Sequence, residues 1–268
     1  TPKPSSAASD VYKRQIEQGY NIIFGTTFGY IDAMAEMAEE YPDVIFLHCS
    51  GYLNNDTNFA NYFGKMYQPR YLSGLAAGAM TDSNKIGYVA AFPIPEVIRG
   101  INAFAAGVNE VNPDATVEVV WTFTWFGPEA ETQAANALLE TGADVLAQHQ
   151  DSTATGLAAE AAGAKWISYN TAYGKDSAPE AFVTAPVWDW GPYYVDIVES
   201  IIDGTFSTES YWGGMETGLV SLYDLSSDVP SDIATLIGEK TDAIIDGTLE
   251  VEIVEEEFIS NVIGTVNP

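Results

Sequence analysis

The sequence predicts an α/β fold built from parallel sheets with helices on both faces. From residue 18 onward, short apolar runs alternate with longer stretches of helical periodicity, a rhythm typical of β-α-β units. Glycine, proline or aspartate separates many of these segments, as expected where a strand or helix ends. The chain has 268 residues, of which 47% are apolar, so it can bury one large core or two medium ones.

The first half of the chain contains three predicted strands and three predicted helices. In the helix from Ile31 to Tyr41, apolar residues recur at helical spacing and acidic residues occupy the other face. The segment from Asn58 to Met80 is interpreted as one long helix, whose small residues would let it approach a sheet closely. The strands are residues 21–24, 43–47 and 85–91, and the remaining helix is 96–109.

The second half repeats the same rhythm. Gly204 and Gly247 stand where two of its helices are expected to stop. The joint from Thr81 to Asn84 is interpreted as a crossover, so two sheets are expected rather than one. The predicted strands are residues 117–121, 144–147, 165–169, 181–184 and 219–222, and the helices are 129–141, 154–162, 193–203 and 231–246.

Residues 1–15 form a polar leader that fits neither helical nor strand periodicity. They hold three of the ten basic residues of the chain, Lys3, Lys13 and Arg14. We expect this leader to be disordered or foreign to the protein. Residues 16–19 resemble the tail of a helix.

Composition and charge exclude several classes of function. The net charge of −28 opposes binding to nucleic acid phosphates. No apolar run is long enough for a membrane span, and the leader lacks the apolar core of a signal peptide. His48 and His149 have no partner at metal-ligand spacing, and Cys49 stands in an apolar run as a core residue. No cofactor or metal is therefore expected.

An enzyme is not favoured either. The turn Gly25–Gly29 follows a strand, but it matches neither phosphate-binding glycine pattern, and no nucleophile elbow is present. The acidic pair Glu129 and Glu131 is expected on a solvated helix face. A sensor domain of a regulator would need a DNA-binding or membrane-spanning segment, which is not seen.

Aromatic residues gather where predicted strands end, and this is where open α/β sheets hold their ligands. Trp121 and Phe123 are expected in the core, since residues 121–126 alternate as a strand does. The candidate ligand-contacting aromatics are Phe28, Tyr30, Phe92, Trp125, Trp190 and Tyr193.

Polar groups at the same strand ends complete the candidate site. His149 and Asp151 follow the predicted strand 144–147, and Asp151 can accept a hydrogen bond from a ring N–H or an exocyclic amine. Flat π faces with a hydrogen-bonding edge suit a planar heterocycle such as a purine. The residues therefore predict a protein that captures a ligand rather than one that transforms it.

Longer motifs carry a resemblance to a known family. From residue 18 to 246 the chain resembles the basic membrane protein (PnrA-like) family of ABC-transporter substrate-binding proteins, and the purine-base, adenine-type subgroup in particular. His149-Gln-Asp-Ser152 departs from the expected His-Thr-Asp-Ser but keeps the aspartate. The framework matches are residues 19–30, 41–44, 70–74 and 86–89, and the subgroup matches are 92–104, 149–152, 190–194 and 211–214.

The resemblance implies a type I periplasmic-binding-protein fold, with two doubly wound lobes joined by a hinge and a ligand in an aromatic cleft between them. It also implies that the first lobe lacks its opening strand and helix here, and that the chain is truncated at its N-terminus. The implied lobes are residues 16–84 with about 190–205, and residues 85–189 with about 206–225, while 226–268 form a C-terminal helix and acidic tail of unassigned lobe.

The implied function is capture of a purine base or nucleoside, with adenine favoured, and delivery to an ABC permease and its ATPase subunit. The implied location is the periplasmic or extracellular face of the membrane, which the protein would contact only through the permease or a lost lipid anchor. A sugar or autoinducer-like ligand on the same fold is the alternative.

Overall fold

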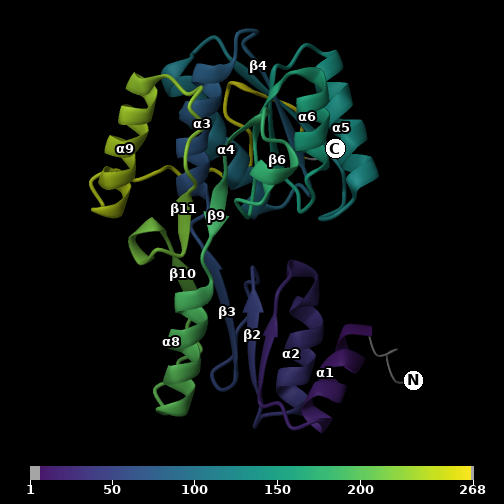
Figure 1. The fold of residues 1–268 in the computed structure, drawn as a ribbon. Helices are drawn as coiled ribbons and strands as arrows, with labels where there is room; N and C mark the ends of the chain where they lie inside the picture. Colours follow the sequence, from purple (N-terminus) through teal and green to yellow (C-terminus); the bar gives the residue numbers. More distant parts are fainter. Residues whose placement is uncertain (1–6, 267–268) are drawn as a thin grey trace. The chain divides into compact units, whose positions relative to one another are not determined.

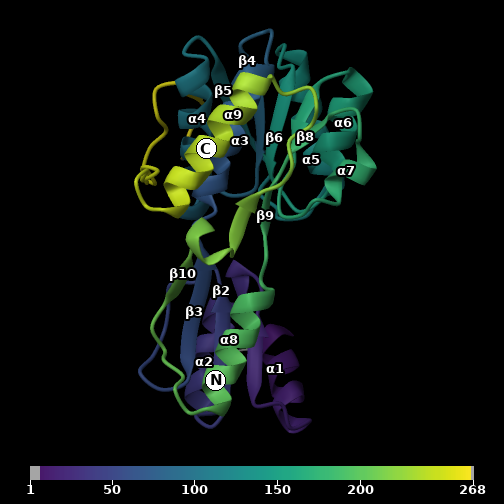
Figure 2. The same ribbon diagram turned by 60° about the vertical axis from the view of Figure 1, so that its left-hand side comes forward.

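The computed structural model describes residues 7–266 and has an α/β architecture (Figures 1 and 2). A four-stranded and a six-stranded parallel sheet are accompanied by one two-stranded antiparallel pair. The predicted fold class is confirmed. The chain divides into two compact units: unit 1 contains the described residues up to Lys65 together with Trp190–Gly213, and unit 2 contains Met66–Asp189 and the described residues from Gly214 onward.

Unit 1 is built on the sheet β1-β2-β3-β10. Met34 and Phe46 are fully buried where α2 packs on this sheet, because the apolar face of the helix and the apolar strands exclude water together. Its strands are β1 (Ile22–Gly25), β2 (Ile45–Cys49), β3 (Phe59–Gly64) and β10 (Tyr211–Gly213), and its helical segments are α1 (Ala7–Glu17), η1 (Phe28–Tyr30), α2 (Ile31–Glu40) and α8 (Gly191–Ile202).

Two expectations for unit 1 were wrong. The first part of the expected helix 58–80 is strand β3, which pairs with β2 on one side and β10 on the other. The leader contains helix α1, because Tyr12 and Ile16 lie four residues apart and both pack into the core against α2. Leader residues 1–6 lie outside the described residues.

Unit 2 is built on the sheet β12-β5-β4-β6-β7-β8. The direction of strand addition reverses at β4, so α4 covers one face of the sheet and α5 and α6 cover the other (Figures 1 and 2). The strands are β4 (Lys85–Ala90), β5 (Thr116–Trp121), β6 (Val145–His149), β7 (Lys165–Ile167), β8 (Phe182–Thr184) and β12 (Val262–Ile263).

Helix α3 (Tyr67–Met80) belongs to unit 2, although the sequence placed it in the first lobe. It packs against α4 (Pro95–Val111) at very short range, because Gly74 and Gly107 place no side chain between the two backbones. The other elements of unit 2 are α5 (Pro128–Glu140), α6 (Ala154–Ala162), α7 (Gly174–Ser177), β9 (Pro186–Trp188), η2 (Met215–Thr217), β11 (Val220–Leu222) and α9 (Ser231–Ile245).

Within residues 7–266 we find no helix with the length and apolar character needed to cross a bilayer.

Candidate ligand-binding site

The carboxyl ends of four neighbouring strands of unit 2 carry the candidate site. Strands β5, β4, β6 and β7 lie side by side and parallel, so the residues that follow them emerge at one edge of the sheet. The amide N–H of Asp151 donates to the carbonyl of Trp125 at 3.0 Å and joins the loops after β5 and β6. Four of the predicted site residues, Phe92, Trp125, His149 and Asp151, are brought together in this way.

The aromatic rings at this edge form a continuous series. The ring centroids of Phe92 and Trp125 are 5.3 Å apart, those of Trp125 and His149 are 6.1 Å apart, and those of His149 and Tyr169 are 4.6 Å apart. Phe92 and Trp125 are half-buried, whereas His149 is 3% exposed. Phe92 and Trp125 can therefore offer π faces to a ligand, and the buried imidazole of His149 packs against Trp125 from inside the protein.

Asp151 is exposed, and its carboxylate is held in a fixed orientation. Asn170 Nδ2 donates to Asp151 Oδ1 at 2.7 Å, and Asn170 Oδ1 accepts from Trp188 Nε1 at 3.1 Å. The two contacts fix which end of the Asn170 amide faces the acid. Among the described residues nothing donates to Asp151 Oδ2, so this oxygen can accept from a ligand. Asn170 was not predicted, although it follows β7 as the other site residues follow their strands.

The loop that carries Asp151 is held by hydrogen bonds from the buried side chain of Gln148. Its side-chain amide donates to the carbonyls of Gln150 and Ser152 at 2.9 and 2.8 Å, and its oxygen accepts from Trp166 Nε1 at 2.9 Å. Two of these contacts are buried and the one to Ser152 is partly buried, and the loss of a hydrogen-bond partner away from water is costly. The loop is therefore a rigid platform for the acid.

Glu131 of α5 also fastens this loop, so the expectation that it lies on a solvated face was wrong. Its side chain is fully buried and accepts from the amide of Gly127 at 3.0 Å and from Ser152 Oγ at 2.6 Å. The acid sits in the first turn of α5, where the helix dipole favours negative charge. It thereby ties the loop after β5 to the loop after β6.

The ionisation of the two polar site residues follows from burial. Partial desolvation raises the pKa of Asp151, the negative charges of Glu131 and Glu96 add to that effect, and the Asn170 hydrogen bond opposes it. Desolvation lowers the pKa of His149, against the contact of its Nε2 with Glu96 Oε1 at 3.5 Å. At neutral pH the site therefore presents a carboxylate and an uncharged imidazole.

We expect affinity for a purine to be constant between pH 7 and 8 and to fall on acidification, before an aspartate of ordinary pKa 3.8 would be protonated. The reason is that protonation of Asp151 turns one carboxylate oxygen into a donor and weakens the group as an acceptor, and its raised pKa moves protonation to higher pH. Calorimetric titration at several pH values measures the affinity.

The same shift in the pKa of Asp151 affects the free energy of unfolding, which decreases as pH rises from 3.8 through the raised pKa.

Asp151→Asn is the control for the pH dependence of affinity, because it removes the ionisation of residue 151 while ionisation of the purine itself is unchanged. A variant that shows the same acid-dependent loss as the wild type would assign the effect to the ligand rather than to Asp151.

Arg70 of α3 lies buried beside these residues. Its guanidinium carbon is 4.0 Å from the centroid of the Tyr169 ring, and its Nη1 donates to the carbonyl of Gln148 at 2.6 Å. This contact clamps the end of β6 directly before His149. No local pattern in the sequence indicates this role, because Arg70 comes from a helix far away along the chain.

The other four predicted site residues lie in unit 1. Trp190 is half-buried at the start of α8, with its ring centroid 5.4 Å from that of Tyr62. Tyr193 is only 6% exposed and packs between Tyr62 and Tyr211, at centroid distances of 4.7 and 4.6 Å, so packing accounts for its position.

Phe28 and Tyr30 belong to η1, the turn after β1. Phe28 is half-buried, and the exposed Tyr30 packs edge-on against Tyr12, with the ring centroids 6.2 Å apart. Ligand contact by these two residues and by Trp190 and Tyr193 stays a prediction.

The expected core positions of Trp121 and Phe123 were wrong. Trp121 is half-buried at the end of β5, where it stacks on Phe258 and its Nε1 donates to the carbonyl of Thr265 at 2.8 Å. Phe123 is 54% exposed, because the chain leaves the strand at Thr122 and the alternation of faces ends there.

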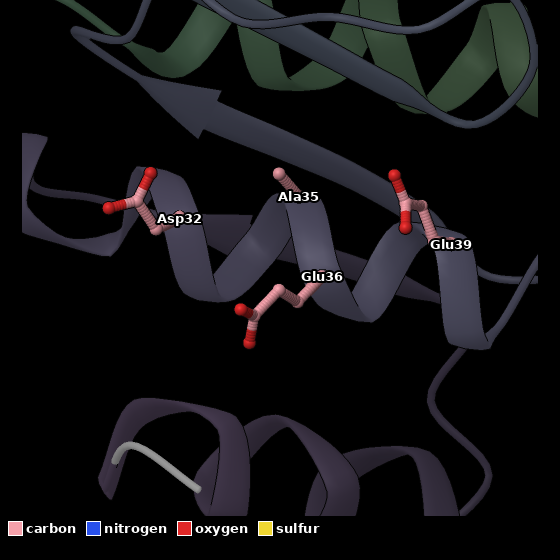
Figure 3. Close-up of a pocket in the computed structure, with 4 residues that line it drawn as sticks. All are labelled: Asp32, Ala35, Glu36 and Glu39. Carbon is pink, nitrogen blue, oxygen red and sulfur yellow. The ribbon is translucent and has the colours of Figure 1, made fainter. Parts of the chain in front are cut away.

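A separate pocket lies along α2 in unit 1 (Figure 3). Three exposed carboxylates, from Asp32, Glu36 and Glu39, line it together with the methyl group of Ala35. None of these four described lining residues offers an aromatic face for stacking. Across residues 7–266, no group of three or more His, Cys, Asp or Glu side chains is placed to hold a metal ion.

The parallel-sheet α/β fold is that of solute-binding proteins of the periplasmic-binding type. The chain belongs to the family described as ABC transporter substrate-binding protein PnrA-like, whose model matches residues 5–253. The resemblance noted in the sequence is confirmed, as is the prediction of a binding protein rather than an enzyme. The matched region begins inside the leader that the sequence had placed outside the family.

Two curated relatives are similar over most of the chain. A protein of Haloferax volcanii, provisionally named as a glucose-binding protein of an ABC transporter, is 42% identical over 92% of this chain and 62% of its own length. A purine-binding protein of Brucella abortus is 40% identical over 87% of this chain and 65% of its own length. The chain thus spans slightly less than two thirds of each relative.

A solved structure of similar fold is an ABC transporter solute-binding protein from Aeropyrum pernix. It superimposes with a TM-score of 0.81 at 16% identity and covers 96% of this chain and 84% of that one.

Proposed function

We propose that this protein captures a purine, with adenine favoured, as the substrate-binding component of an ABC importer. The observation that carries the proposal is the exposed carboxylate of Asp151, oriented by Asn170 and placed beside the half-buried rings of Phe92 and Trp125. A purine presents flat faces for those rings and N–H donors for Asp151 Oδ2. The similarity to a purine-binding protein supports the same ligand class.

The energetics allow capture without covalent chemistry. Stacking contributes about 1–3 kcal/mol per base, and a hydrogen bond to a charged group contributes about 1.5–3 kcal/mol. These contacts together supply about 2.5–6 kcal/mol, a large part of the about 8.2 kcal/mol that corresponds to a dissociation constant of 1 μM.

Isothermal titration of the protein with adenine, guanosine, ribose and glucose tests the proposal. We expect heat with adenine, weaker or no heat with guanosine, and none with either sugar. The absence of binding to both purines would refute the proposal.

A sugar or autoinducer-like solute is the second candidate, and the relative named for glucose favours it. Sugars also stack on tryptophan, but they rely more on charged partners. Arg99 pairs with Glu255 and is already engaged. Arg70 is buried under Tyr169 and donates through Nη1 to the carbonyl of Gln148, while its Nε and Nη2 have no hydrogen-bond partner among the described residues. Heat with glucose or ribose but not with adenine would establish this alternative.

Delivery to a membrane permease with a separate ATPase subunit, at the periplasmic or extracellular face of the membrane, is part of the proposal. It rests on the family to which the chain belongs.

A further inference from the structure

Phe123 combines two unfavourable features in the loop after β5. Its φ angle is 56°, in the left-handed region that a bulky side chain adopts only at a cost in free energy. Its side chain is also 54% exposed, so a large apolar ring remains in water. Neither feature stabilises the fold.

The backbone around Phe123 explains the conformation but not the choice of residue. The amide of Phe123 donates to the carbonyl of Ala91 at 2.9 Å, and the amide of Thr122 donates to that of Ala90 at the same distance. These bonds continue the pairing of β5 with β4 and hold the loop in place. Glycine or asparagine would adopt the same φ at lower cost, so the phenyl ring is present for another reason.

The ring lies next to the candidate site. Its centroid is 6.4 Å from that of Phe92 at an interplanar angle of 76°, and Phe92 in turn lies 5.3 Å from Trp125. Phe92 is thus in contact with Trp125 and with Phe123. Strained residues that their surroundings hold in place are found preferentially at ligand clamps.

We propose that Phe123 is a ligand-contacting residue whose exposed ring packs on the planar molecule held by Asp151. The inference rests on the proposed function and extends it, since it adds an aromatic contact to the series formed by Phe92 and Trp125. Binding then covers the apolar ring that is otherwise left in water.

Phe123→Gly separates this role from a packing role, because glycine removes both the ring and the backbone strain. We expect adenine to bind about tenfold more weakly, or worse, since one stacking contact is lost. We expect the midpoint of thermal unfolding to be unchanged or higher. Phe123→Asn, which tolerates the same φ with less added flexibility, should give the same loss of affinity.

Phe126→Ala is the matched control. Phe126 stands three residues further along the same loop and is 64% exposed, so its substitution removes an aromatic ring of similar exposure to that of Phe123. Affinity for adenine should stay within about twofold of the wild type.

The outcomes are distinguishable. Wild-type affinity in both Phe123 variants overturns this inference and leaves the proposed function standing. A lower unfolding midpoint in both variants makes Phe123 a packing residue and also overturns it. A wild-type protein that binds neither adenine nor guanosine overturns both proposals.

Discussion

Replacing Asp151 with alanine is expected to weaken adenine binding by about 10- to 100-fold. A hydrogen bond to an ionised group contributes about 1.5–3 kcal/mol, and each 1.4 kcal/mol changes affinity tenfold. Because Asp151 is exposed and its loop is fastened by Gln148 and Glu131, the fold should survive the substitution. Isothermal titration measures the affinity, and circular dichroism checks the fold.

Glu129→Gln is the control for Asp151→Ala. Glu129 is an exposed acid on α5, so the variant removes one negative charge from the same unit without touching the site. Its affinity for adenine should equal that of the wild type. An Asp151→Ala protein that binds adenine as tightly as the Glu129→Gln protein would remove Asp151 from the site.

Gly74→Ala is expected to lower the midpoint of thermal unfolding by about 4–8 °C, which corresponds to about 2 kcal/mol for a protein of this size. A Cβ atom on Gly74 would lie 2.0 Å from the carbonyl oxygen of Phe104, and one on Gly107 would lie 2.1 Å from that of Tyr71. These atoms belong to helix backbones, which cannot move aside as a flexible side chain can. Helices α3 and α4 would have to separate.

Gly238→Ala is the matched control, because Gly238 lies inside helix α9 and nothing lies within 4 Å of the position that a Cβ atom would take there. Here alanine should stabilise the protein by about 0.5–1 kcal/mol through its higher helix propensity. A glycine-to-alanine substitution is thus expected to lower stability at position 74 and to raise it at position 238. A stabilised Gly74→Ala protein would contradict the close packing of α3 and α4.

Much of the fold could be predicted from the alternation of apolar runs and helical segments. One exception was β3, where Phe59–Gly64 leads almost without a break into α3 and the small residues suggested one continuous helix. Pairing with β2 and β10 makes these residues a strand. Such long-range pairing is absent from local sequence patterns.

The candidate site could be predicted in part. The rule that ligands lie at the carboxyl ends of strands located Phe92, Trp125 and Asp151, and applied to β7 it would also have located Asn170. Arg70 and Glu131 could not be found in this way, since they reach the site from helices. Their roles depend on burial and on hydrogen bonds made only in the folded chain.

The fastening of the Asp151 loop also bears on how ligand preference can change during evolution. Gln148, Glu131 and Asn170 connect the acid to the interior, so substitutions there disturb the framework together with recognition. Phe92 and Trp125 are half-buried and Phe123 is exposed, so none of the three belongs to the buried hydrogen-bond framework that holds the acid. Relatives with the same fold can therefore come to bind different ligands by substitution of these aromatic residues, while the position of Asp151 is kept.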